Sequence, residues 1–179
     1  PVDESDVASL AAALLAGGEH ALRLGLTDEL PWLASQERLT FARVGVIDPL
    51  DPDDYLAHGG IAGLRRALTM DRTAIVDEVA ESGLRGRGGA GFPAGIKWRT
   101  VEATASAQKY VCVNADEGDS GTFADRMLME GDPFTLLEGM AIAGVAVGAT
   151  IGYVYIRSEY PDAIATMQSA IDHARGRGW

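Results

Sequence analysis

Cysteine is nearly absent from the sequence, since Cys112 is the only one among 179 residues. A single cysteine cannot form a disulfide within the chain, nor can it supply the ligands of an iron–sulfur cluster or a multi-thiolate zinc site. Such sparing use of cysteine is typical of a reducing compartment, so we expect a cytoplasmic location. Histidine is also scarce, and His20, His58 and His173 show no metal-ligand spacing. The residues of this chain therefore predict no metal site.

Positive charge is in the minority, because 15 Lys and Arg face 26 Asp and Glu, a net charge of −11. Binding to nucleic acid or to an anionic membrane is therefore not expected. Residues 139–156 carry no charge at all. Gly152 interrupts this run, however, and β-branched and aromatic residues follow it. We therefore expect a helix over 133–149 and a buried strand over 151–157 rather than direct insertion into a membrane.

Helical and strand patterns alternate along most of the chain. Helices are predicted over 61–70, 71–83 (ending at Gly83), 93–106 (opened by Pro93) and 133–149, near Thr122–Arg126, and from Pro161 onward. A buried strand is predicted over 109–114, with Cys112 as a core thiol rather than a nucleophile. This order indicates an α/β fold with a parallel sheet.

The first 58 residues follow a different pattern. "DVASLAAALLAG" predicts a helix, followed by Gly17–Gly18 and a second short helical run. Residues 31–58 contain three prolines and no sustained period, so we expect an extended connector. Because the chain lacks an initiating methionine and stops at Trp179 just after a helix, we also expect it to be a piece of a longer polypeptide.

A glycine-rich stretch, "GRGGAGFPAGIKW" (86–98), fits the spacing G-x-G-x-x-G at Gly86, Gly88 and Gly91. An ordinary Rossmann turn would need a strand before it, but a helix is predicted there. A P-loop is excluded as well, because no Gly-Lys-Ser/Thr follows.

Two interpretations of this stretch remain open. Bare backbone N–H groups near a helix N-terminus, with Arg87 and Lys97 close by, favour an anionic ligand such as a phosphate, and the poorly shielded ring of Phe92 could then stack on a base. Alternatively, the glycines form a turn that packs a helix tightly on the sheet, with Phe92 in the core.

Four polar residues, Asn114, Asp116, Glu117 and Asp119, follow the first strand, where open α/β sheets bind ligands. The plain alternative is a solvated turn with Asx capping. Carboxylates do not face a phosphate, so in a shared site they would meet hydrogen-bond donors, such as the N3–H and ribityl hydroxyls of a flavin or the ribose hydroxyls of a nicotinamide cofactor. The two stretches together would suit a nucleotide-like ligand.

Taken together, the two stretches resemble those of a known family. "GLRGRGGAGFPAGIKW" followed by "VCVNADEGDSGTFADR" is similar to the flavoprotein subunits that oxidise NADH in respiratory complex I. The same family includes the diaphorase subunits of NAD-reducing hydrogenases and the β subunits of NAD-dependent formate dehydrogenases. The resemblance covers about residues 60–179, and the flanking "QERLTFARVGVIDPLDPDDYLAHGG" and "YIRSEYP" look most like the formate dehydrogenase β subunit.

The resemblance implies an incomplete Rossmann-like FMN-binding α/β domain over 59–179, preceded by a helical and extended segment. Residues 1–58 would be the end of a thioredoxin-like domain and its connector. FMN would exchange hydride with NAD(H) and electrons with a [4Fe–4S] cluster whose ligands are not in this chain. The partners would be an iron–sulfur subunit and a molybdenum-containing catalytic subunit. Alternatives are the equivalent subunit of complex I or of a hydrogenase, or a non-catalytic scaffold of the same fold.

The resemblance also implies roles for individual residues, none of them an acid or base catalyst. Phe92 would stack on the adenine of NADH, and Asp119 would reach a ribose of NADH. The positions that would line the FMN and dinucleotide phosphate region are Gly86, Arg87, Gly88, Gly89 and Lys97, and those that would contact FMN are Asn114, Asp116 and Glu117. The family's later flavin motif and its cluster cysteines would lie beyond Trp179. We therefore expect this chain alone to bind FMN weakly or not at all and to be inactive.

Overall fold

The computed structural model describes residues 2–26, 29–119 and 121–179, which form two units, Pro1–Leu39 and Thr40–Trp179. The first unit contains the 3-10 helix η1 (Glu4–Asp6) and the helices α1 (Val7–Leu15) and α2 (Pro31–Ala34). Helix α1 confirms the first predicted helix. The second helical run does not form in residues 19–26, and residues 27 and 28 lie outside the described residues.

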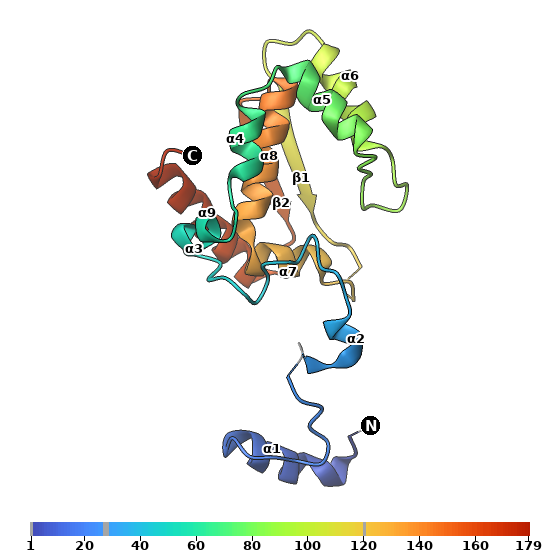
Figure 1. The fold of residues 1–179 in the computed structure, drawn as a ribbon, viewed down its shortest axis with the longest axis vertical. Coiled ribbons are helices and arrows are strands. Elements are labelled where there is room, and N and C mark those ends of the chain that lie inside the picture. The colour runs from blue at the N-terminus through green and yellow to red at the C-terminus, as the bar shows by residue number, and fades with distance from the viewer. Residues whose placement is uncertain (1, 27–28, 120) are drawn as a thin grey trace. The chain divides into compact units, whose positions relative to one another are not determined.

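The second unit holds the remaining elements, drawn in Figure 1 from cyan to red. In chain order they are α3 (Pro52–Ala57), α4 (Ala62–Ala67), α5 (Arg72–Glu81), α6 (Ala94–Ala103), β1 (Tyr110–Ala115), α7 (Ala124–Gly131), α8 (Pro133–Val147), β2 (Ile151–Ile156) and α9 (Pro161–Gly176). This order confirms the predicted α/β class. The prediction of an extended connector over 31–58 is wrong where α2 and α3 form, because Pro31 and Pro52 each occupy the first turn of a short helix.

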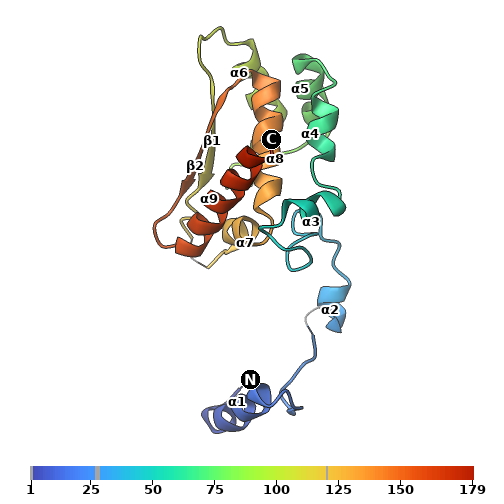
Figure 2. The same cartoon turned by 90° about the vertical axis from the view of Figure 1, so that its left-hand side faces the viewer.

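Helix α8 is the centre of the second unit. Its first turn places Phe134 against Tyr55 and Ile61, and its last turn places Ala146 and Val147 against α5. Its middle packs on a third cluster formed by β1, α7 and α9. In Figure 2 the two strands therefore lie to one side of α8, and α4 and α5 lie to the other. The helix ends at Gly148 in a left-handed conformation, and no helix in the described ranges is long and apolar enough to cross a bilayer.

The two strands form a parallel pair, as predicted, with Tyr110 opposite Ile151 and Ala115 opposite Ile156. Successive side chains point to opposite faces. One face, including Val113 and Val154, packs on the helices. The other face is exposed; it carries Tyr110, Cys112, Asn114, Ile151, Tyr153 and Tyr155.

The predicted burial of both strands, with Cys112 as a core thiol, is therefore wrong. Cys112 is exposed. Its side chain points to the face of the sheet that no helix of the described residues covers, and the run of apolar residues in β1 hid this two-sided pattern from the sequence.

A half-buried carboxylate, that of Glu138, links α8 to α4 and to the residues before it. Glu138 Oε2 accepts hydrogen bonds from the Tyr55 hydroxyl (2.5 Å) and the Ile61 N–H (2.7 Å), and its Oε1 accepts one from the Leu64 N–H (2.9 Å). The pKa of Tyr55 is raised above its ordinary value, mainly by burial and to a smaller degree by the hydrogen bond to Glu138. The same carboxylate thus serves as the cap of α4, because Ile61 at the N-cap position has no side-chain acceptor.

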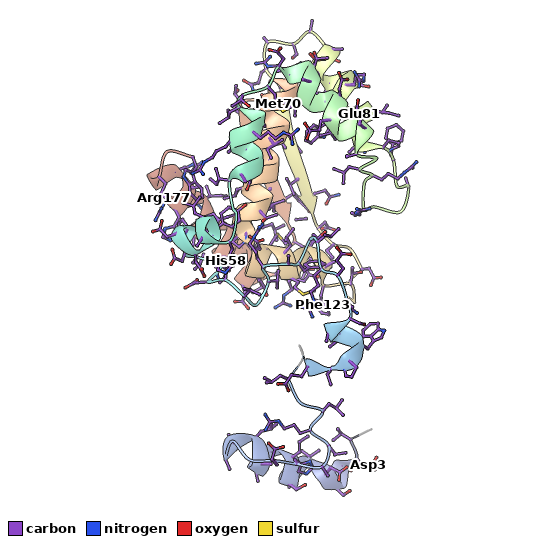
Figure 3. All side chains as sticks on the ribbon, in the orientation of Figure 1. Asp3, His58, Met70, Glu81, Phe123 and Arg177 are labelled. Atoms are coloured by element: carbon purple, nitrogen blue, oxygen red, sulfur yellow. The ribbon has the colours of Figure 1, made fainter. Side chains whose placement is uncertain are left out.

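Two further contacts hold the helices of the second unit together. Helices α5 and α6 approach each other closely at Gly95, where a Cβ atom would lie 2.5 Å from the Ala80 Cα. At the far end of the unit, both Nη atoms of Arg177, which is labelled in Figure 3, donate to the Asp53 carboxylate at 2.6 and 2.7 Å. This contact links the end of α9 to α3. The α5–α6 contact fixes the position of the glycine-rich stretch, which connects these two helices.

Candidate functional site

The glycine-rich stretch forms a narrow hairpin between α5 and α6. The Gly86 N–H donates to the Phe92 carbonyl (2.9 Å), and the Ala94 N–H donates to the Leu84 carbonyl (2.8 Å). These bonds close the base of the loop and leave residues 87–91 at its tip. Helix α5 ends two residues before Gly83, whose φ of +69° confirms the predicted glycine cap.

The tip of this loop has open backbone. The N–H groups of Arg87, Gly88 and Gly89 donate to no acceptor within the described residues. A Cβ atom at Gly88 or Gly89 would meet nothing within 4 Å, so no packing contact requires glycine there. Phe92 is 44% exposed and is not a core residue. The tight-packing interpretation therefore applies to Gly95 and not to the loop tip.

Two cations beside this tip have no acidic partner among the described residues. Arg85 is used within the loop, since its Nη1 donates to the Gly91 carbonyl at 2.9 Å. In the described ranges no carboxylate lies within ion-pair distance of Arg87 or Lys97, and the Lys97 Nζ lies 5.6 Å from the centre of the Phe92 ring. Open amides and uncompensated positive charge together make a surface suited to an anionic group.

The acidic loop leaves the carboxyl end of β1, where Asx turns shape it. Asn114 Oδ1 accepts the Asp116 N–H and Asp119 Oδ1 accepts the Gly121 N–H, each at 3.1 Å. The Asx-capped turn that the sequence left open is therefore present. Asp116 differs from its neighbours, because its carboxylate accepts no hydrogen bond from any residue that the structure describes.

Glu117 has a structural task in this loop. Its φ is +44°, and its two carboxylate oxygens accept the N–H groups of Asp125 and Arg126, each at 3.1 Å. Phe123, labelled in Figure 3, stands at the N-cap of α7 and has no acceptor of its own, so Glu117 caps the helix from outside. Burial, and secondarily the charge of Glu117, raises the pKa of Asp125. Whether Glu117 also contacts a ligand stays a prediction.

Arg157 and Tyr160, which the sequence did not indicate as site residues, support the acidic loop from the neighbouring strand. Arg157 Nη1 donates to the Glu117 carbonyl at 2.9 Å, and its guanidinium lies 5.3 Å from the centre of the Tyr160 ring. The sequence could have indicated Arg157 by its position just after the second strand, because the carboxyl ends of adjacent parallel strands meet at one edge of a sheet.

The structure thus brings the predicted residues together in two groups. Gly86, Arg87, Gly88, Gly89, Phe92 and Lys97 belong to the α5–α6 loop, and Asn114, Asp116, Glu117 and Asp119 belong to the loop after β1 (Figure 1). Among the described residues, no hydrogen bond or ion pair joins the two groups. Nor does that part of the chain contain a cluster of three His, Cys, Asp or Glu that could bind a metal.

Carboxylates at the carboxyl end of a parallel strand and a cationic, glycine-rich loop are features found in α/β domains that bind nucleotides. The family model of the Nuo51 FMN-binding domain, from the complex I 51K family, matches residues 79–178, more than half of the chain. The chain belongs to this family, which confirms the resemblance, the fold class and FMN as the cofactor.

Individual relatives agree with this assignment. The chain is 53% identical over 143 residues to the NADP-reducing hydrogenase subunit HndC of Solidesulfovibrio fructosivorans, with 80% of this chain and 29% of that protein covered. It is 53% identical over 128 residues to an NADH-quinone oxidoreductase subunit of Rhizobium meliloti strain 1021, with 70% and 30% covered. To the corresponding NADH-quinone oxidoreductase subunit of Escherichia coli K12 it is 42% identical over 132 residues, with 73% and 30% covered.

A solved structure shows the same relation. The chain superposes on a crystal structure of an NAD⁺-reducing [NiFe]-hydrogenase in the air-oxidised state with a TM-score of 0.60 and 27% identity. The superposition covers 98% of this chain and 29% of the hydrogenase chain. The chain therefore spans less than a third of the length of each relative named here.

Proposed function

We propose that this chain supplies part of the cofactor site of an NAD(H)-dependent flavoprotein oxidoreductase. When bound, FMN would supply the chemistry that couples two-electron exchange with a nicotinamide cofactor to single-electron exchange with a [4Fe–4S] cluster in the complete protein. The observation that carries the proposal is the tip of the α5–α6 loop, where open amides lie next to Arg87 and Lys97. Two relatives support it, since their names describe oxidation of NADH and reduction of NADP.

The residues of the α5–α6 loop fit the phosphate groups of such cofactors. The open N–H groups of Gly88 and Gly89 offer donors, and Gly86 shapes the base of the loop. Arg87 and Lys97 neutralise the phosphate charge. Phe92 offers an exposed ring on which the adenine of NADH stacks.

The acidic loop fits the opposite end of the flavin nucleotide, which carries hydrogen-bond donors and no charge. Asp116 has a carboxylate ready to accept from the ring N3–H or a ribityl hydroxyl. The side chains of Asn114 and Asp119 can each form hydrogen bonds in addition to those of their Asx turns. We assign Asp119 to a ribose of NADH. Glu117 also contacts FMN, through the lone pairs of its carboxylate that the capping of α7 leaves free. These residues bind and orient, and none of them has to move a proton.

For the complete protein we favour the NAD-reducing β subunit of a cytoplasmic formate dehydrogenase. The segments flanking the two loops support this, and it implies an iron–sulfur subunit and a molybdenum-containing subunit as partners. The equivalent subunit of complex I or of a hydrogenase is the alternative, with the same chemistry at this site. A scaffold without catalysis is disfavoured, because packing alone gives no reason for exposed glycines beside cations that have no acidic partner among the described residues. We also propose that residues 1–58 are the end of a thioredoxin-like domain and its connector.

Substitution of Lys97 tests the proposal. In the complete flavoprotein, Lys97→Met is expected to weaken FMN or NADH binding by about tenfold or more, since a hydrogen bond to a charged group contributes about 1.5–3 kcal/mol. The measurements are the flavin content after purification and the rate of NADH–ferricyanide reduction. Arg99→Met is the matched control, because Arg99 lies in the same helix and pairs with Asp77 at 2.7 Å. Equal behaviour of the two variants would favour the scaffold.

A further inference from the structure

Arg157 and Glu117 leave the same edge of the sheet on neighbouring strands. Glu117 comes two residues after β1, and Arg157 follows β2 directly. Ala115 and Ile156, the last residues of the two strands, are opposite each other in the parallel register. A side chain as long as arginine can therefore reach across from the end of β2 to the loop after β1, although 40 residues separate the two positions.

The contact between them stabilises an unfavourable backbone conformation. The φ of Glu117 is +44°, in the left-handed region that residues with a side chain adopt only when their surroundings hold them there. Arg157 Nη1 donates a 2.9 Å hydrogen bond to the carbonyl oxygen of this residue. The carboxylate of Glu117 is engaged as well, in capping α7. The backbone carbonyl and the side-chain carboxylate of Glu117 are thus both held by hydrogen bonds.

Arg157 is itself held in place by Tyr160. Its guanidinium lies 5.3 Å from the centre of the Tyr160 ring, and that of Arg126 lies 5.2 Å from the same ring. Tyr160 is 4% exposed and belongs to the core cluster under the sheet. The side chain of Arg157 is 19% exposed, so its position is set by the core and not by solvent.

We propose that Arg157 is a positioning residue for the flavin end of the cofactor site. By fixing the turn at Glu117, it sets the direction in which the neighbouring Asp116 presents its carboxylate, which accepts no hydrogen bond within the described part of the chain. The inference depends on the proposed function, since it assigns a role in the same site. Arg157 itself does not contact the cofactor, and its effect passes through the backbone of the acidic loop.

The test compares two ligands, FMN and riboflavin, which share the flavin ring and differ in the phosphate. In the complete flavoprotein, Arg157→Met is expected to lower the affinity for both by the same factor of about ten, and Arg157→Lys by about three, because only the contact to the ring end is affected. Lys97→Met is expected to lower the affinity for FMN only. The smaller loss in Arg157→Lys, which keeps a cationic donor, separates the positioning role from a general loss of structure.

Glu159 provides the control, because it pairs with Arg157 on its solvent side at 3.3 Å. Glu159→Gln is expected to leave both affinities within about twofold. Unchanged affinities in Arg157→Met, or a loss confined to FMN, would overturn the inference. If Arg157→Met does not fold, Arg157→Lys decides by the same criteria. Unchanged affinities in both Lys97→Met and Asp116→Asn would instead contradict the proposed function.

Discussion

Alanine at Gly95 is expected to lower the stability of the protein by about 2 kcal/mol and to release bound flavin, because the added Cβ overpacks the α5–α6 contact. That atom would lie 2.5 Å from the Ala80 Cα and 2.7 Å from the Ala80 backbone nitrogen. Backbone atoms cannot move aside as the end of a flexible side chain does, so α6 itself must shift. Because the glycine-rich loop connects these helices, the shift moves Arg87 and Lys97 together with it.

A second helical glycine provides the matched control for Gly95→Ala. Gly139 lies in α8, and a Cβ atom there would meet nothing within 4 Å. Gly139→Ala is therefore expected to stabilise the protein by about 0.5–1 kcal/mol, through helix propensity alone. The measurements are the melting temperature and the flavin content of the complete protein. Similar melting temperatures for the two variants would show that the close contact between α5 and α6 is absent.

Removal of the Glu138 carboxylate is expected to cost about 3 kcal/mol or more, because each buried polar group left unpaired costs about 1–3 kcal/mol. Glu138→Ala leaves the Tyr55 hydroxyl and the Ile61 N–H without an acceptor, and both residues are buried. The φ of Ile61 is +65°, a strained conformation that its hydrogen bond to Glu138 helps to hold. Without the carboxylate, the start of α4 loses this support. The melting temperature of the complete protein measures the effect.

An exposed glutamate provides the comparison for Glu138→Ala. Glu78 accepts a 2.8 Å hydrogen bond from Arg66, but the two side chains are 47% and 68% exposed. Its replacement by alanine is expected to cost less than about 1 kcal/mol, as is usual for surface ion pairs. A loss at Glu138 as small as that at Glu78 would mean that the three hydrogen bonds contribute little to the fold.

Local features of the fold could be predicted from the sequence, and features that depend on distant residues could not. The glycine cap at Gly83, just after α5, and the change from α8 to β2 are set by residues within a few positions, and both were predicted correctly. Helices α2 and α3 are too short to show a period, so only their prolines marked them. The exposure of Cys112 depends on which elements cover the sheet, and no residue of β1 carries that information.

The candidate site shows the same division. Arg87 stood out in the sequence because glycines flank it, and Lys97 because it closes the same glycine-rich stretch. The structure adds that neither has an acidic partner in the described part of the chain. The position of Arg157 after a predicted strand was visible in the sequence, but its contact with Glu117 was not, since the two lie 40 residues apart and the contact requires the parallel register. The use of the Glu117 carboxylate as a helix cap likewise depends on where α7 begins.

The ratio of FMN affinity to riboflavin affinity tests the central claim, that Arg87 and Lys97 with the open amides beside them bind the phosphate of a flavin nucleotide. In the complete protein, the double substitution Arg87→Met and Lys97→Met is expected to reduce this ratio by about tenfold or more and to leave riboflavin binding unchanged. Asp116→Asn is expected to weaken both ligands and to keep the ratio. A ratio that survives the loss of both cations would place the phosphate elsewhere and contradict the account.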